Sequence, residues 1–187
     1  EFVLEAVRWH YVPLSFAAPA LRGDREIVQA AVRRNGLALE YAAEELRGDR
    51  EVVLGAVGNC ETSLDFAAAE VLGDRAFVLA VAKLDGFVGN ILELSAESLR
   101  CDREVALAAV GARAGNLRFA ADDLRGDRDF VLDCLRLNGE ALECAAQGFR
   151  GDWEMVLEAV RQSGCALRHA VDELRGDRGL VLEAVRQ

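Results

Sequence analysis

The chain has 187 residues, of which 52% are hydrophobic and 29% are charged, and its 32 acidic and 22 basic side chains give a formal net charge of −10. This acidic balance argues against nucleic acid as a partner, because binding to phosphate backbones depends on clustered Lys and Arg. The uncharged stretches are far shorter than the roughly 20 apolar residues of a membrane-spanning helix, so the sequence predicts no membrane span.

An aspartate recurs at nearly constant spacing along the whole chain. The spacing is 25 residues, except for 28 residues between Asp74 and Asp102, so the repeat at 74–101 holds a three-residue insertion. Such self-similarity is typical of a protein whose short units stack on one another. We therefore predict one repeat domain over residues 1–187. Because Glu1 aligns with Glu26 and Gln187 with Gln162, we expect the chain to be a fragment of a longer protein.

Each repeat is expected to begin with an α-helix capped by its aspartate. A carboxylate at this position can accept a hydrogen bond from an early backbone N–H and favours the positive end of the helix dipole. After Asp24, apolar residues at 27, 28, 31 and 32 follow a spacing of three and four, which predicts a helix of about 11 residues with one buried stripe. The predicted helix caps are Asp24, Asp49, Asp74, Asp102, Asp127, Asp152 and Asp177.

The second half of each repeat is predicted to be a turn and another helix. Asn35-Gly36 indicates a turn, since both residue types tolerate the left-handed backbone conformation. Leu39, Ala42, Ala43 and Leu46 would then face the core, and Arg47-Gly48 would end the helix. We predict an all-α fold, an α-solenoid of about seven 25-residue helix-turn-helix repeats; leucine-rich, tetratricopeptide and ankyrin repeats are excluded by their different patterns and periods.

The repeat resembles the domain-of-unknown-function family 4116 of algae, other protists and giant viruses. The resemblance is carried by Leu46-Arg47-Gly48-Asp49-Arg50-Glu51-Val52-Val53-Leu54 and by Asn35-Gly36-Leu37-Ala38-Leu39-Glu40-Tyr41-Ala42. It spans essentially the whole chain. It implies no enzymatic activity, and it suggests an interaction scaffold only by analogy with other helical repeats.

Arg-Gly-Asp occurs five times and could suggest binding to an adhesion receptor. We favour a structural interpretation, in which Arg ends one helix, Gly makes the turn and Asp caps the next helix. The arginines beside each aspartate, such as Arg25 and Arg47, could bind an anionic ligand, but pairing with neighbouring carboxylates in a ladder is favoured. Rows of Asp and Glu on the second helices lack the dense oxygen spacing of a calcium loop and indicate a solvated face.

No catalytic, cofactor or metal site is expected. His169 aligns with Phe16, Tyr41 and Phe66, which favours a half-buried position, and His10 lies at a predicted helix end. Neither histidine has a nucleophile at a recognisable spacing. The five cysteines form no Cys-x-x-Cys motif and no Cys/His pair at zinc spacing.

Residues that depart from their own repeat column are the candidate protein-interaction residues, because large apolar groups at turns often form the energetic centre of an interface. Local repacking against the adjacent repeat is an equally good explanation for Trp153 and for the insertion. The candidates are Trp9, Tyr11, Leu84, Phe87, Val88, Ile91, Leu137, Phe149 and Trp153.

These observations favour a non-catalytic scaffold or linker that binds one or more proteins. The distribution of the family suggests an intracellular location, for example the plastid, and a subunit of a larger algal assembly such as a photosystem-antenna complex. An alternative is a regulatory or targeting arm of a longer enzyme whose catalytic domain lies outside this chain. Ligand or metal binding by an acidic groove is the third hypothesis.

Overall fold

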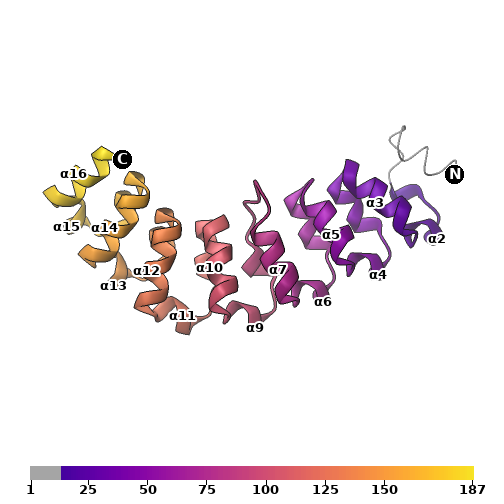
Figure 1. The fold of residues 1–187 in the computed structure, drawn as a ribbon, viewed down its shortest axis with the longest axis horizontal. Helices are drawn as coiled ribbons and strands as arrows, with labels where there is room; N and C mark the ends of the chain where they lie inside the picture. The colour runs from indigo at the N-terminus through magenta and orange to yellow at the C-terminus, as the bar shows by residue number, and fades with distance from the viewer. Residues whose placement is uncertain (1–13) are drawn as a thin grey trace. The chain divides into compact units, whose positions relative to one another are not determined.

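The computed structural model describes residues 14–187, and this part of the chain contains α-helices and 3-10 helices but no strand (Figure 1). The predicted all-α fold of repeated helical units is therefore confirmed. The chain divides into two compact units, Glu1–Gly89 and Asn90–Gln187.

In both units a long α-helix alternates with a 3-10 helix and a one-turn α-helix. The described elements of the first unit are η1 (Leu14–Phe16), α2 (Pro19–Arg22), α3 (Arg25–Arg34), η2 (Gly36–Tyr41), α4 (Glu44–Arg47), α5 (Arg50–Val57), η3 (Glu61–Phe66), α6 (Ala69–Leu72) and α7 (Arg75–Ala82). Those of the second unit are α8 (Ile91–Leu94), α9 (Glu97–Arg100), α10 (Arg103–Ala112), η4 (Ala114–Phe119), α11 (Asp122–Gly126), α12 (Arg128–Leu137), η5 (Gly139–Cys144), α13 (Gln147–Arg150), α14 (Trp153–Gln162), η6 (Gly164–His169), α15 (Asp172–Arg175) and α16 (Arg178–Arg186).

The long helices form one row within each unit and pack against their neighbours in chain order (Figure 1). The predicted apolar stripe is confirmed, since Ile27, Val28, Ala31 and Val32 of α3 are all buried. Each helix can bury this stripe only because the adjacent repeat covers it, which is the principle of a stacked repeat protein.

The predicted second helix is wrong, because two short elements replace it. The 3-10 helix η2 ends at Tyr41, and Ala42 and Ala43 are extended, with φ −69° and ψ 151° at Ala42. The N–H of Ala43 donates to the carbonyl oxygen of Arg22 in the preceding repeat at 2.9 Å. A continuous α-helix would direct this N–H to a carbonyl four residues earlier in its own repeat. The break thus links neighbouring repeats.

The Asn-Gly turn forms as expected, but the reason for its glycine differs from the prediction. Among residues 14–187 only Gly86 has a positive φ, and Asn35 is extended at φ −148°. A Cβ on Gly36 would lie 2.3 Å from the carbonyl oxygen of Ala56 in the next repeat. Glycine is required here because the neighbouring long helix approaches the backbone, and the same approach recurs at Gly139 and Gly164.

Candidate interaction surfaces

All seven predicted aspartate caps are confirmed. In each case the carboxylate accepts a hydrogen bond from the backbone N–H three residues later, at 2.7 to 3.1 Å. The capped helices are α3, α5, α7, α10, α12, α14 and α16. The aspartate of Arg-Gly-Asp therefore serves the local backbone, as the structural interpretation of this motif predicts.

The arginine after a capping aspartate pairs with the cap of the next repeat. Arg25 contacts Asp49 at 2.6 Å and Glu51 at 2.8 Å, and Arg128 contacts the equivalent carboxylates of the following repeat. Arg50 and Asp74 form a further pair. This row of pairs, which we call the Arg–Asp ladder, confirms the predicted ladder. Its arginines are exposed and its aspartates are half-buried, so solvent screens each pair and each contributes little to stability.

The arginines that end the one-turn helices bind in two ways. Arg125 and Arg175 pair with Asp122 and Asp172, as predicted, whereas others donate to backbone carbonyls. Arg22 Nη2 donates to Ser15 O at 2.7 Å, and Arg100 Nη2 donates to Glu93 O at 2.7 Å. Arg150 Nε donates to His169 O at 2.6 Å. These guanidinium groups hold the 3-10 and short α-helical segments in place, and they are directed at the protein itself.

Trp153 occupies the position of an arginine in the Arg–Asp ladder. Like those arginines, it contacts the capping aspartate of the next repeat. The indole Nε1 donates to Asp177 Oδ1 at 3.3 Å, and a Cβ on Gly179 would lie 4.0 Å from the indole Cζ2. Gly179 aligns with Glu154 and Glu51, so both partners of this ladder position have changed. Local repacking accounts for the position of Trp153, although 46% of the residue remains exposed.

The insertion places two of its apolar candidates in the core. Phe87 is 6% exposed and Ile91 is 0% exposed, so the structure removes both from the candidate interface. A Cβ on Gly89 would lie 2.6 Å from the Phe87 ring, which shows how closely the loop folds over that ring. Val88 is 53% exposed, and its N–H lies 3.3 Å from Glu61 Oε2.

Asn116 is a structural residue that the sequence analysis missed. It occupies an alanine-rich column, is fully buried, and its Oδ1 accepts a hydrogen bond from Leu92 N at 3.1 Å. Its Nδ2 donates to Ala109 O at 3.0 Å. The helix α8 begins after Asn90, whose side chain makes no cap, so Asn116 satisfies an early N–H of α8 from the next repeat. The signal in the sequence is a polar asparagine at a repeat position where Ala38, Ala141 and Ala166 stand in other repeats.

The other candidates differ in exposure. Leu137, at the end of α12, is 55% exposed, whereas Leu84 and Phe149 are half-buried. Trp9 and Tyr11 lie outside the described residues. Within residues 14–187, the candidates that remain well exposed are Val88, Leu137 and Trp153.

A polar cluster on η5 and η6 brings a serine, a histidine and a glutamate together. Ser163 Oγ donates to Glu140 Oε1 at 2.8 Å, while Arg168 Nη2 and His169 Nε2 lie 2.7 and 3.3 Å from Glu140 Oε2. Burial would raise the pKa of Glu140, but hydrogen bonds from Ser163 and His169 and the charge of Arg168 outweigh it, so this pKa is lowered. A Ser-His-acid triad needs the hydroxyl on the imidazole, and here the hydroxyl is bonded to the carboxylate.

The cysteines do not form disulfides and one of them is fully buried. Burial raises the pKa of Cys134 to about 12, so its thiol stays protonated and unreactive at neutral pH. Among the described residues no group of His, Cys, Asp and Glu is arranged to hold a metal ion. In the same part of the chain, no helix is long and apolar enough to cross a membrane.

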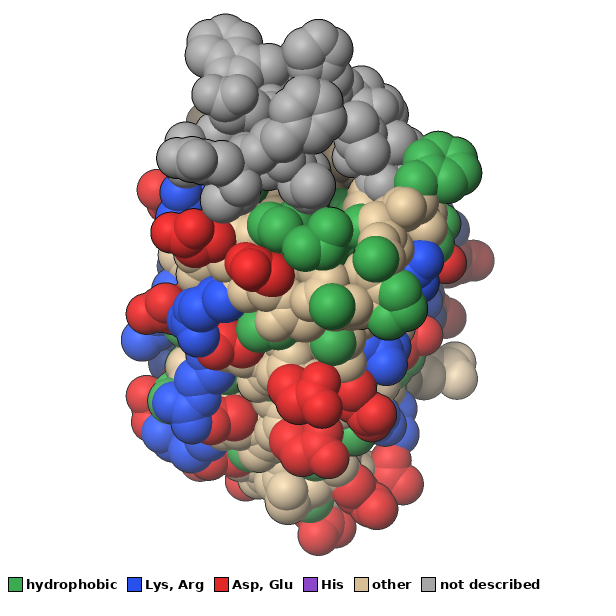
Figure 2. All heavy atoms as spheres, turned by 90° about the vertical axis from the view of Figure 1, so that its right-hand side faces the viewer, with side chains coloured by type: hydrophobic (Ala, Val, Ile, Leu, Met, Phe, Trp, Pro, Cys, Tyr) green, Lys and Arg blue, Asp and Glu red, His purple; other side chains and the backbone are tan. Residues whose placement is uncertain are grey.

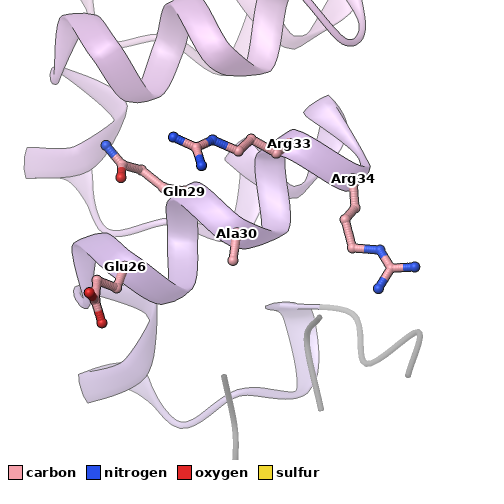
Figure 3. Close-up of a pocket in the computed structure, with 5 residues that line it drawn as sticks. All are labelled: Glu26, Gln29, Ala30, Arg33 and Arg34. Carbon is pink, nitrogen blue, oxygen red and sulfur yellow. The ribbon is translucent and has the colours of Figure 1, made fainter. Parts of the chain in front are cut away.

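The surface depressions follow the repeat. One of about 700 Å³ includes Glu97, Arg100 and Asp122, and a smaller one of about 390 Å³ is lined by equivalent positions two repeats later. A third, of about 450 Å³, lies on α3, where Arg33 and Arg34 point in different directions (Figure 3). Its lining residues, Glu26, Gln29, Ala30, Arg33 and Arg34, all come from one helix and do not converge on a common point.

The repeat itself connects this chain to known proteins. The family model described as "Domain of unknown function (DUF4116)" matches residues 1–47, 24–72, 102–150 and 152–187. The chain belongs to this family. No curated protein and no solved structure matches it.

The DUF4116 matches follow the structural repeat. The match over residues 24–72 begins at the Asp24 cap and covers the α3 repeat and nearly all of the α5 repeat. The matches leave residues 73–101 uncovered, and this segment holds the three-residue insertion. In this DUF4116 chain the insertion coincides with the positive φ of Gly86 and with the replacement of a 3-10 helix by α8.

Proposed function

We propose that this DUF4116 chain is a non-catalytic scaffold or linker that binds other proteins through exposed side chains on its repeats. The observation that carries the proposal is Leu137, which is 55% exposed at the end of α12. Equivalent positions in other repeats hold the polar residues Asn59 and Gln162. Leu84 and Ala112 also occupy this column, but Leu84 is half-buried. Leu137 is therefore the large apolar side chain that stays well exposed at this position, and it is suited to contact with a partner.

The frame around Leu137 supports this function. The long helices are capped, and backbone hydrogen bonds and the Arg–Asp ladder hold each repeat against its neighbours. Such a frame holds surface side chains in fixed positions, which lowers the entropy lost when a partner binds. A place in a larger algal assembly, such as a photosystem-antenna complex, is the finer form of this proposal and is based on the distribution of the family.

The decisive experiment is affinity capture of the protein from its source, followed by mass spectrometry of intact complexes. We expect a complex of defined stoichiometry, and we expect Leu137→Gln, which installs the residue of the equivalent position 162, to reduce its yield. Gly111→Ala is the matched control, because a Cβ there meets no atom within 4 Å. A free monomer from the source would contradict the proposal, and an adjoining catalytic domain in the captured gene product would favour the regulatory-arm alternative.

A further inference from the structure

The described part of the first unit carries a row of aromatic side chains on its 3-10 helices. Phe16, Tyr41 and Phe66 are the last residues of η1, η2 and η3, which pack side by side in that order. Phe16 is 81% exposed and Tyr41 is 37% exposed, while Phe66 is half-buried. Because the three residues hold the same repeat position, their rings line one edge of the stacked 3-10 helices.

Acidic side chains accompany this row. Glu40 and Asp65 directly precede Tyr41 and Phe66, and both are exposed. Hydrogen bonding to Glu40 is the main cause of a raised pKa of Tyr41. At the other edge of the unit, by contrast, Asp49 and its neighbours are neutralised by arginines of the Arg–Asp ladder. Neither Glu40 nor Asp65 forms an ion pair with a described residue, so their negative charge remains available.

The end of the molecule that carries α2 and α3 shows a similar combination. Hydrophobic side chains gather there directly above a group of Asp and Glu side chains (Figure 2). A protein surface with exposed apolar groups beside unpaired carboxylates attracts a partner that is both cationic and partly apolar.

The second unit provides an internal comparison. Its equivalent column holds Leu94, Phe119, Cys144 and His169. Two of the four preceding residues are arginines there, and Arg118 contacts Cys144 while Arg168 contacts Glu140. The combination of three successive aromatic rings at this position with the unpaired carboxylates of Glu40 and Asp65 is therefore specific to the first unit.

We propose that Phe16, Tyr41, Phe66, Glu40 and Asp65, here called the aromatic–acidic surface, bind an extended protein segment with an arginine or lysine at every third residue. The inference rests on the proposed scaffold function and names the partner chemistry of one surface. Cations are attracted to exposed aromatic faces and to carboxylates. Packed helices lie about 8 to 10 Å apart. In the extended polyproline II conformation three residues complete one turn and rise about 9 Å, so every third side chain faces the same surface and successive cations match successive repeats.

The test uses the whole chain and a fluorescent synthetic peptide with arginine at every third position, separated by alanine and serine. Fluorescence anisotropy gives the Kd at low and high salt. We expect Tyr41→Ala and Phe66→Ala each to weaken binding by about 3- to 30-fold, the range of a cation–π contact. Glu40→Gln with Asp65→Asn should weaken binding at low salt and reduce its salt dependence. Phe119→Ala is the matched control and should leave the Kd unchanged.

One further variant and one further peptide test whether binding depends on the aromatic ring and on the spacing of the arginines. Tyr41→Phe keeps the ring and should bind the peptide with little change in Kd, and a peptide with the same arginines at every second position should bind more weakly. Circular dichroism confirms that each variant is folded. Absence of binding by the unaltered chain, or equal Kd values for the ring, charge and control variants, would overturn the aromatic–acidic surface.

Failure of this surface and failure of the scaffold function give different results. A stoichiometric complex captured equally from the source by the unaltered chain and by the Glu40→Gln/Asp65→Asn variant retains the scaffold and overturns the surface. A source protein that remains monomeric overturns the scaffold, and a peptide Kd that responds to the ring and charge variants then still supports the surface.

Discussion

The indole of Trp153 donates to the same Asp177 oxygen that caps α16 through the N–H of Leu180. Both contacts lower the pKa of Asp177, the backbone N–H more than the indole. An aromatic residue thus takes the place of an arginine in the Arg–Asp ladder, and Gly179 replaces the carboxylate that a guanidinium would have paired with. The two substitutions form a matched pair across adjacent repeats.

This pairing predicts that Trp153→Arg and Gly179→Glu are coupled. Arginine at 153 can reach Asp177 but finds no second carboxylate, whereas the double variant recreates the arrangement of Arg128, Asp152 and Glu154. We expect a favourable coupling free energy of about 0.3 to 1 kcal/mol in a double-mutant cycle, the range of an exposed ion pair. Urea unfolding measures it, and strictly additive effects would contradict the pairing.

The close approach at the turn glycines predicts a large effect of one methyl group. In Gly139→Ala the new Cβ would lie 2.3 Å from Ala159 O, so the repeats must separate, and we expect a loss of about 1 to 3 kcal/mol in the free energy of unfolding. Gly111→Ala, in α10, meets no atom within 4 Å and should instead stabilise by about 0.5 to 1 kcal/mol. Thermal unfolding distinguishes them, and equal shifts in Tm would rule out the steric explanation.

The cap supplied across repeats predicts that Asn116→Ala is destabilising, even though alanine is the common residue of this column. The change leaves the buried N–H of Leu92 without its acceptor, which costs about 1 to 3 kcal/mol. Hydrogen exchange should show faster exchange of the Leu92 amide in the variant. Ala141→Gly, at the equivalent position of the α12 repeat, is the control; it should leave the Leu92 amide protected.

The lowered pKa of Glu140 predicts a specific pH dependence. The ionised form is favoured by folding, so its stabilisation is present above the ordinary value of 4.5 and is lost as the pH falls through the lower folded-state pKa. Glu140→Gln should remove this part of the acid sensitivity, by less than about 1 kcal/mol because the group is partly solvated. Urea midpoints of both proteins between pH 6 and pH 3 check this; parallel pH profiles would show that Glu140 makes no such contribution.

The sequence could not show which candidate interface residues are exposed and which are buried, and the structure distinguishes them. Phe87, Ile91 and Val88 all lie in or beside one insertion, yet only Val88 faces solvent. Nothing in the local pattern shows which apolar side chains of an irregular loop become buried and which face solvent. Leu137 remained exposed because it lies at the end of a regular helix, where the spacing of the apolar stripe already indicates which side faces water.

The sequence by itself determined the 25-residue period, the seven capping aspartates, the buried stripe of the long helices and the Arg–Asp ladder. These features depend on neighbours along the chain or on exact repetition, so a pattern of residues is sufficient to predict them. Only the tertiary structure decided that the second helix breaks at Ala42 and Ala43, that Gly36 makes room for Ala56, and that Asn116 caps α8. Each of these depends on a backbone group of an adjacent repeat, whose distance is set by packing.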